Sequence, residues 1–206
     1  MKLLVATRSH GKQREFRAAL AAAGHEVVFP DDVGLPESPE EAALEHGETF
    51  EANARRKAEH FAARSGLPTL ADDSGLEVIS LGGQPGVRSK RWAGASGTPA
   101  EVDAANNAEL QRRLAGAPEH RRAARYRCVL AFVARAGAVP VVTEGSCAGT
   151  ILAEPRGAGG FGYDPYFLSA ELGRTFAEAS VEEKERVSHR GRALAAMLPH
   201  LPASAP

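Results

Sequence analysis

Cysteine and tryptophan are scarce in this chain, with two cysteines and one tryptophan among 206 residues. Cys128 and Cys147 stand outside any C-x-x-C or Cys/His pattern, which excludes a zinc site built on clustered cysteines. We expect both to be buried as small apolar side chains, because free cysteines usually are. Cysteine chemistry therefore gives no lead to the function.

Long apolar runs and an excess of one charge are missing as well. The longest useful apolar run, residues 129–134, is far shorter than the roughly 20 residues that span a bilayer, and residues 3–6 are too short for the core of a secretion signal. We therefore expect a cytoplasmic protein without a membrane partner. Lys and Arg number 25 against 26 Asp and Glu, a balance that argues against broad nucleic-acid binding.

The first thirty residues predict an α/β fold. Residues 2–7 have the pattern of a buried strand, residues 11–23 that of a helix, and residues 25–29 that of a second strand. Gly24 ends the helix. A strand, a helix and a strand in this order are typical of α/β proteins.

The rest of the chain continues this alternation and contains no repeat or long linker. Helices are predicted at residues 48–64, at residues 98–116 after a Thr98/Glu101 capping box, and from a Ser180/Glu183 capping box to Pro199. Strands are predicted at residues 67–71, 77–80, 125–134 and 139–151, with a turn at residues 72–75 and a hairpin around Gly137. Residues 156–164 hold four glycines, which suits close approach of the backbone to a ligand.

Residues 7–12, Thr-Arg-Ser-His-Gly-Lys, leave a strand and enter a helix. Backbone N–H groups and the helix dipole favour an anion at such a place, and Lys12 adds a positive charge. The segment is not a Walker loop, because Ala6 and Gln13 replace its first glycine and its Ser/Thr. From the residues alone, an ordinary surface loop at a helix start is the more common explanation of such a segment.

Two adjacent acids, Asp72 and Asp73, follow an apolar strand. Neighbouring carboxylates repel each other, and an Asx turn explains only one of them. A divalent cation would remove the repulsion, and Mg²⁺ prefers one or two carboxylates together with water and phosphate oxygens. A turn and a metal site both remain open from these residues alone.

Other polar residues have ordinary explanations when each is taken alone. Asn53 and Lys57 lie one turn apart on a predicted helix, with Glu45 just before it, and such faces are usually solvated. The basic stretch at residues 184–192 is typical of an exposed helix. Phe161 and Tyr163 are typical of a core.

In their order and spacing, these segments resemble the inosine/xanthosine triphosphate pyrophosphatase family. The resemblance runs from residue 3 to about residue 194, and several of its motifs are long enough to be specific. The motifs are LVAT at 4–7 with GK at 11–12, ETFEANA at 48–54 with KA at 57–58, ADDSGL at 71–76, LGGQPG at 81–86, GFGYDP at 160–165, TFAE at 175–178, EK at 183–184 and SHR at 188–190.

The resemblance implies a two-lobed α/β fold in which an elongated mixed sheet is flanked by helices, with the active-site cleft between the lobes. Residues 1–206 would form one such domain whose lobes share the sheet, with a flexible tail from about residue 199. The implied activity is Mg²⁺-dependent hydrolysis of ITP, dITP and XTP to the monophosphate and pyrophosphate. A homodimer is implied, with no nucleic-acid partner.

The resemblance also implies roles for particular residues near the phosphates. Asp73 would be the catalytic base and a Mg²⁺ ligand, with Asp72 and Lys57 beside it. Glu45 is the preferred second metal ligand, and Glu40 and Glu41 are the alternatives. Thr7, Ser9 and Lys12 would hold the triphosphate, and Lys57 and Lys184 would add positive charge around it. The other implied substrate contacts are Arg8, His10, Gly11, Asn53 and Ser74. Arg8 and Ser9 depart from the family, which usually has Gly and Asn there.

At the other end of the substrate, the resemblance implies recognition of a 6-oxo purine. Phe161 would stack on the base, and Asp164 would accept hydrogen bonds from its ring N–H groups. Gly162 and Tyr163 would also bind the substrate. His189 and Arg190 would contact the 6-oxo edge.

Three competing functions need to be weighed. A related pyrophosphatase could act on pyrimidine nucleotides, and a base panel would separate the two. A non-catalytic nucleotide sensor is disfavoured by the intact Asp72, Asp73 and Lys57. A nucleic-acid-binding module would need a basic stripe interleaved with aromatic residues, which this chain lacks.

Overall fold

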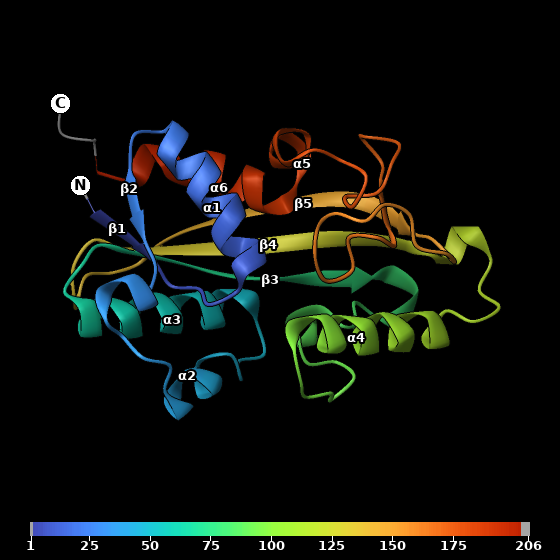
Figure 1. The fold of residues 1–206 in the computed structure, drawn as a ribbon, viewed down its shortest axis with the longest axis horizontal. Helices are drawn as coiled ribbons and strands as arrows, with labels where there is room; N and C mark the ends of the chain where they lie inside the picture. The colour runs from blue at the N-terminus through green and yellow to red at the C-terminus, as the bar shows by residue number, and fades with distance from the viewer. Residues whose placement is uncertain (1, 203–206) are drawn as a thin grey trace. The chain divides into compact units, whose positions relative to one another are not determined.

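The computed structural model describes residues 2–202 and contains one six-stranded sheet, in the order β2-β1-β3-β4-β5-β6 (Figure 1). Its strands are β1 (Lys2–Val5), β2 (Glu26–Val28), β3 (Thr69–Val78), β4 (Ala123–Val133), β5 (Val141–Ile151) and β6 (Phe167–Ser169). Strand β1 runs parallel to both β2 and β3, whereas β5 and β6 are antiparallel. The predicted α/β class with a mixed sheet and flanking helices is therefore confirmed.

The chain divides into two compact units. Unit 1 comprises Met1–Asp73, Cys128–Gly145 and Arg190–Pro206, and unit 2 comprises Ser74–Arg127 and Ser146–His189. Strands β3 and β4 each contribute residues to both units, as does β5.

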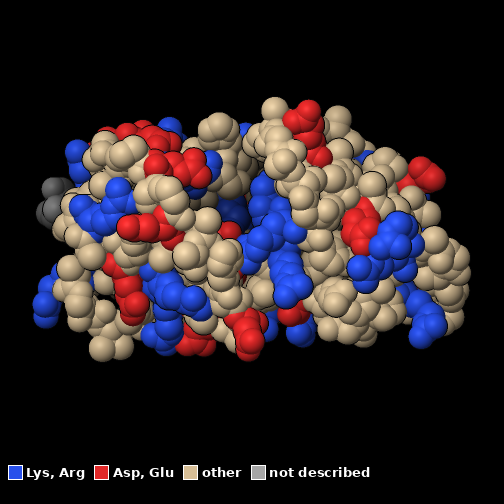
Figure 2. Space-filling model, turned by 90° about the horizontal axis from the view of Figure 1, so that it is seen from below, with Lys and Arg blue, Asp and Glu red and all other residues tan. Residues whose placement is uncertain are grey.

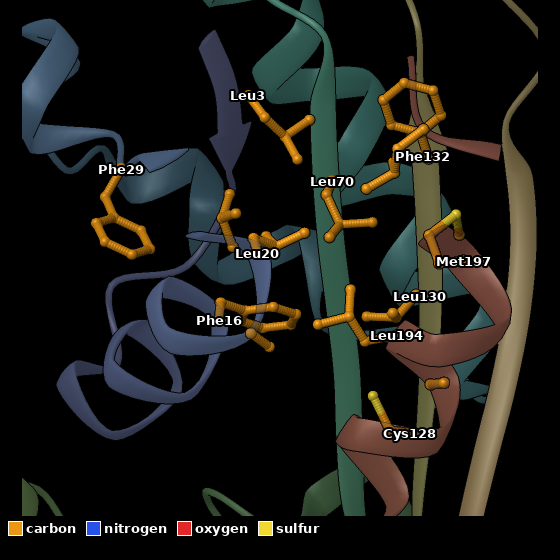
Figure 3. Close-up of a cluster of buried hydrophobic side chains, with 14 residues drawn as sticks. Leu3, Phe16, Leu20, Phe29, Leu70, Cys128, Leu130, Phe132, Leu194 and Met197 are labelled. Atoms are coloured by element: carbon orange, nitrogen blue, oxygen red, sulfur yellow. The ribbon is translucent and has the colours of Figure 1, made fainter. Parts of the chain in front are cut away.

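Unit 1 places helices on both faces of its strands. Helices α1 (His10–Ala22) and α6 (His189–Met197) cover one face, and α3 (Phe50–Ser65) covers the other (Figure 1). Between α1, α6 and the sheet lies an apolar core in which Phe16, Leu20 and Leu70 are fully buried (Figure 3). Burying a side chain of this size contributes about 1.5–3 kcal/mol, so this core fixes α1 on the strands that precede and follow it.

Unit 2 has a second, separate core. It is built around Tyr126 of β4, whose ring centroid lies 4.6 Å from that of Phe167 and 6.0 Å from that of Phe176. Helices α4 (Pro99–Arg113) and α5 (Val181–Val187) belong to this unit. Both begin with the capping boxes predicted from the sequence, Thr98 with Glu101 and Ser180 with Glu183.

The structure corrects three local predictions. The single helix predicted from residue 180 to Pro199 is two helices, α5 and α6, because Ser188 between them has an extended backbone. The turn predicted at residues 72–75 is wrong, because β3 runs without interruption from Thr69 to Val78. The acids and Ser-Gly look like a turn locally, but side chains from both faces of the sheet satisfy the buried carboxylates. A short helix, α2 (Pro39–Leu44), also forms between residues 29 and 48, where no helix was predicted.

The structure describes only part of the tail that was predicted to be flexible from about residue 199. Leu201 is buried and joins the core of unit 1. Residues 203–206 lie outside the described residues.

No helix within residues 2–202 is long and apolar enough to cross a membrane. Lys and Arg side chains lie among Asp and Glu side chains on the face drawn in Figure 2. This mixture agrees with the net charge of −1.

Candidate active site

The register of the parallel strands brings the predicted phosphate turn beside the paired aspartates. Val5, the last residue of β1, pairs with Leu70 of β3, and the N–H of Ala6 donates to the Leu70 carbonyl at 2.8 Å. Strand β3 therefore continues beyond the carboxyl end of β1. In open α/β sheets, ligands bind at such carboxyl ends, where the strand order reverses.

Asp72 and Asp73 lie on opposite faces of the sheet, because successive side chains of a strand alternate. Asp72 contacts residues of α1 and α6, and Asp73 contacts residues of α3. The repulsion expected between neighbouring acids is thereby avoided without a turn. Each carboxylate has its own set of partners.

Asp72 is fully buried between two cations. The ammonium of Lys12 lies 2.8 Å from its carboxylate, and the guanidinium of Arg190 lies 3.4 Å from it. Burial alone would raise the pKa of Asp72, but the charges of Lys12 and Arg190 hold it well below its usual range. Arg190 also pairs with Glu15. Asp72 is therefore a permanent anion that holds two positive side chains in place.

Asp73 has the opposite character. Its carboxylate accepts a hydrogen bond from Asn53 Nδ2 at 2.8 Å and lies 4.0 Å from the ammonium of Lys57. Burial raises the pKa of Asp73 and the negative charge of Glu45 adds to this effect, against the opposing influence of Lys57 and Lys12. A buried carboxylate with a raised pKa is a group suited to accepting a proton.

Asn53 connects Asp73 to the segment that carries Glu45. Its side-chain oxygen accepts the N–H of Gly47 at 2.7 Å while its amide nitrogen donates to Asp73. A Cβ on Gly47 would collide with Asn53 and Arg56, so the close approach requires glycine. Sequence reasoning assigned Asn53 to the substrate, and the structure gives it a positioning contact.

Glu45, the C-cap of α2, is held by an ion pair of 3.0 Å with Lys57. The charges of Glu45 and Asp73 outweigh burial and raise the pKa of Lys57. We call Lys12, Glu45, Asn53, Lys57, Asp72 and Asp73 the carboxylate cluster. All six residues belong to unit 1.

The phosphate turn leads directly into α1. The N–H of Ser9 donates to Thr7 Oγ1 at 3.3 Å, and Gln13 Nε2 donates to the Thr7 carbonyl at 3.1 Å. Helix α1 then begins at His10, followed by the buried Gly11. Its first turn, which lies wholly within the described chain, carries no acidic side chain. A helix start of this kind favours an anion.

Arg8 departs from its predicted role as a substrate contact. Its guanidinium forms two hydrogen bonds of 2.7 Å with the carboxylate of Glu41, and it also donates to the Leu35 carbonyl at 2.9 Å. A further hydrogen bond of 2.5 Å reaches Asp31. The physical reason is the bidentate match between guanidinium and carboxylate. Arg8 therefore fastens the segment before Glu45, and Glu41 is occupied as its partner.

Unit 2 contains a second group of predicted residues, which we call the aromatic turn, residues 161–164. The N–H of Phe161 donates to Asp164 Oδ2 at 2.9 Å, and a Cβ on Gly160 would collide with the Asp164 side chain. Lys184 of α5 donates to the same Asp164 oxygen at 2.5 Å. Its ammonium also lies 4.8 Å from the centre of the Phe161 ring, a cation–π distance. Lys184, predicted to add charge at the triphosphate, here orders the aromatic turn.

The remaining predicted residues are distributed between the two units. The ring of His189 stacks on Tyr126 at 4.6 Å in unit 2, whereas Arg190 pairs with acids of unit 1. Tyr163 donates its hydroxyl to the Ser89 carbonyl at 2.9 Å. Ser74 directly follows Asp73 on β3 and is half-buried.

Sequence reasoning missed several residues around these groups. Glu15 is the half-buried partner of Arg190, and its position three residues after Lys12 on a helix was an available signal. Asp103 and Asn107 of α4 both contact Gly162 of the aromatic turn. They lie outside every motif, and no sequence pattern identified them.

The donor set of the carboxylate cluster fits a divalent cation. Asp73 and Glu45 bring two carboxylates close enough that the charge of one raises the pKa of the other. No three His, Cys, Asp or Glu side chains within residues 2–202 are grouped to hold a metal without help. Mg²⁺ requires no more than one or two carboxylates, because water and substrate phosphates complete its coordination.

This fold and its carboxylate cluster define an α/β enzyme of the nucleoside triphosphate pyrophosphatase class. The model of the Ham1 family matches residues 3–200, and the chain belongs to the Ham1 family. A dITP/XTP pyrophosphatase of Ralstonia nicotianae is 47% identical over 97% of this chain and 96% of its own length. One of Syntrophobacter fumaroxidans is 50% identical over 93% of this chain and 78% of its own length.

Solved structures agree with the assignment. A HAM1 protein from Coxiella burnetii superposes with a TM-score of 0.81 at 35% identity, covering 97% of this chain and 98% of that one. A nucleoside-triphosphatase, dITP/XTP pyrophosphatase, from Mycobacterium abscessus gives a TM-score of 0.71 at 44% identity, covering 97% and 100%. These matches confirm the family resemblance found in the sequence.

Proposed function

We propose that this chain hydrolyses non-standard purine nucleoside triphosphates, namely ITP, dITP and XTP, to the monophosphate and pyrophosphate. The observation that carries the proposal is the carboxylate cluster, in which buried Asp73 is held by Asn53 beside Lys57. The dITP/XTP pyrophosphatases to which the chain is similar along almost its whole length support the same substrate class.

Charge neutralisation is the first task of the site. The triphosphate brings about four negative charges, and attack of water on such an anion is slow unless positive charge is placed beside it. Lys12 and Lys57 supply two such charges, and the start of α1 offers backbone N–H groups. Asp73 and Glu45 would hold Mg²⁺, which when bound neutralises phosphate oxygens and fixes their geometry.

The proton of the attacking water would pass to a carboxylate oxygen of Asp73. Its raised pKa makes Asp73 a better proton acceptor than an ordinary aspartate, and Asn53 fixes its orientation. Water would attack the α-phosphorus, so that the bond to the bridging oxygen breaks and pyrophosphate leaves. Asp72 keeps its charge throughout and holds Lys12 and Arg190.

Selection of the base would fall to the aromatic turn. Phe161 would stack on the purine, Asp164 would accept a hydrogen bond from a ring N–H, and His189 would face the 6-oxo edge. Adenine presents the reverse donor and acceptor pattern and would leave buried polar groups unpaired. A mismatch of this kind gives discrimination of roughly a hundredfold or more.

The assembly and setting follow from the same proposal. We expect a homodimer acting on the nucleotide pool in the cytoplasm, without nucleic acid or membrane as a partner. Light scattering of the purified protein tests the dimer.

A base panel tests the function. Purified protein with Mg²⁺ is given ITP, dITP, XTP, GTP, ATP and dUTP, and the products are separated by ion-exchange chromatography. We expect inosine and xanthosine monophosphates with pyrophosphate, at rates well above those for ATP and dUTP. Release of orthophosphate, or a preference for ATP or a pyrimidine nucleotide, would contradict the proposal. Omitting Mg²⁺ and adding a chelator tests the metal requirement.

A further inference from the structure

Two side chains of α4 form hydrogen bonds with both backbone polar groups of Gly162. The Gly162 N–H donates to Asp103 Oδ2 at 2.8 Å, and Asn107 Nδ2 donates to the Gly162 carbonyl at 2.9 Å. Asp103 and Asn107 are four residues apart on α4, so both side chains lie on the same face of the helix. Both polar groups of one residue in the aromatic turn are thus bonded to a single helix.

Helix α4, labelled in Figure 1, is itself firmly anchored. It begins with the capping box of Thr98 and Glu101, and its Leu110 is fully buried in the core of unit 2. Asn106, the neighbour of Asn107, holds a second segment: its amide donates to the Lys90 carbonyl at 3.0 Å and accepts the N–H of Ala93 at 2.9 Å. A helix fixed in this way along its length provides a rigid support for the turn.

The turn needs an external support because of its own composition. Four glycines precede or lie within it, and Gly162 has a φ of +63°, a conformation that glycine adopts without strain. Glycine-rich backbone loses much conformational freedom when it is ordered. The α4 contacts hold Gly162 between Phe161 and Tyr163, whose hydroxyl is fixed on the Ser89 carbonyl. Phe161 is therefore presented from a segment held on both sides.

We propose that Asp103 and Asn107 are positioning residues for base recognition. They fix the backbone of Gly162, so that Phe161 and Asp164 are held in a single arrangement in which they contact the purine. This inference rests on the proposed function, since it assigns the base to the aromatic turn. It predicts that losing either contact weakens base binding and leaves the phosphate chemistry of the carboxylate cluster intact.

The test compares Asp103→Ala and Asn107→Ala with wild type. With dITP, we expect the KM of each variant to rise about tenfold, the effect of losing one hydrogen bond of about 1.4 kcal/mol, while kcat changes less than twofold. Competitive inhibition by dIMP should weaken in parallel. Inhibition by pyrophosphate, which has no base, should stay as in wild type.

Two further variants separate positioning from mere stability. Asp103→Asn keeps an oxygen that accepts the Gly162 N–H and should restore the wild-type KM. Lys90→Ala removes the 2.9 Å ion pair with Asp103 and leaves the Gly162 contact in place, so its KM should not change. Thermal unfolding of every variant reports whether it folds. If Asp103→Ala does not fold, the comparison of Asn107→Ala with Asp103→Asn still tests the proposal.

Several outcomes would overturn the inference. An unchanged KM in both alanine variants would do so, as would a fall in kcat at constant KM or an equal loss of dIMP and pyrophosphate inhibition. Failure of the proposed function has a different signature, because wild-type protein would then lack activity on dITP in the base panel. If wild-type protein is active on dITP and both alanine variants have an unchanged KM, only the positioning role of Asp103 and Asn107 is refuted.

Discussion

The two faces of strand β3 treat neighbouring aspartates in opposite ways. On one face, Lys12 and Arg190 surround Asp72 and lower its pKa. On the other face, Asp73 has a hydrogen bond from Asn53 and a longer contact with Lys57, and burial raises its pKa. The residue type and the strand are the same, so the partners alone decide which acid is a structural anion and which can accept a proton.

The comparison teaches that adjacency in sequence is no guide to adjacency in chemistry. Strand alternation places Asp72 and Asp73 on opposite faces of the sheet although they are neighbours in the sequence. The cost of burying Asp72 is offset by two cations that themselves need a partner. Asp73 has weaker compensation, because Lys57 lies 4.0 Å from its carboxylate and burial prevails. The raised pKa that results is what its proposed role requires.

The sharpest way to break the comparison is Asp73→Asn. We expect kcat for dITP to fall about a thousandfold, since a positioned general base contributes roughly 10²–10⁴. The thermal midpoint in the absence of Mg²⁺ should not fall, because the substitution removes a buried charge and keeps the shape. Steady-state kinetics and calorimetry measure both. Activity within tenfold of wild type would show that Asp73 is not the base.

Asp72→Asn should have the converse signature. Removing the anion leaves Lys12 and Arg190 without it, and breaking a buried ion pair from one side costs about 3–5 kcal/mol. Because the pKa of Asp72 is lowered in the folded state, its stabilisation is present above the unfolded value, near 4, and is lost as pH falls further. The difference in urea midpoint from wild type should therefore be largest at neutral pH and shrink below about pH 4.

A surface ion pair in the same unit is the matched control for Asp72→Asn. Glu51 and Arg55 lie one turn apart on α3 with a distance of 2.7 Å. Glu51→Gln should change the free energy of unfolding by no more than about 0.5 kcal/mol. A similar loss in both variants would mean that burial does not distinguish Asp72.

A smaller effect is expected from the contact that fastens the segment leading to Glu45. In a double-mutant cycle of Arg8→Ala and Glu41→Ala, we expect a coupling of about 1 kcal/mol in urea unfolding, since the pair is bidentate and half-buried. The kcat at saturating Mg²⁺ should remain near wild type, in contrast to Asp73→Asn. A large loss of kcat in Arg8→Ala would instead support its original assignment to the phosphates.

Most elements could be predicted from the sequence because their signals are local. The Thr98/Glu101 and Ser180/Glu183 capping boxes each specify a helix start without help from distant residues. Helix α2 was missed although a signal existed, since Glu41 stands three residues after Ser38 and accepts its N–H at 3.3 Å.

The error at residues 72–75 has a different cause. An Asp-Asp-Ser-Gly stretch favours a turn by its own chemistry. The partners that make it a strand, Lys12, Asn53 and Arg190, lie between about 20 and 118 residues away. No local pattern contains that information.

In the candidate site too, local motifs predicted some features and tertiary packing decided the others. The family motifs identified the aspartates and lysines, but they did not say what each side chain contacts. Arg8 and Arg190 were both assigned to substrate from the family resemblance, and in the structure each is bound by acidic side chains that tertiary packing brings to it. Charge predicts that an arginine binds an anion, and only the fold decides whether that anion is a carboxylate or a phosphate.

The pairing of β3 with β1 has one more consequence. Leu4 opposite Thr69 and Val5 opposite Leu70 set which way every later side chain of β3 points. Deleting a single residue between them and the aspartates would move each carboxylate to the other face of the sheet. Asp73 would then face Lys12 and Arg190, and Asp72 would face Asn53. The number of residues between the β1 pairing and the acids is thus as necessary to the proposed site as the acids themselves, although Ala71 has no reactive group.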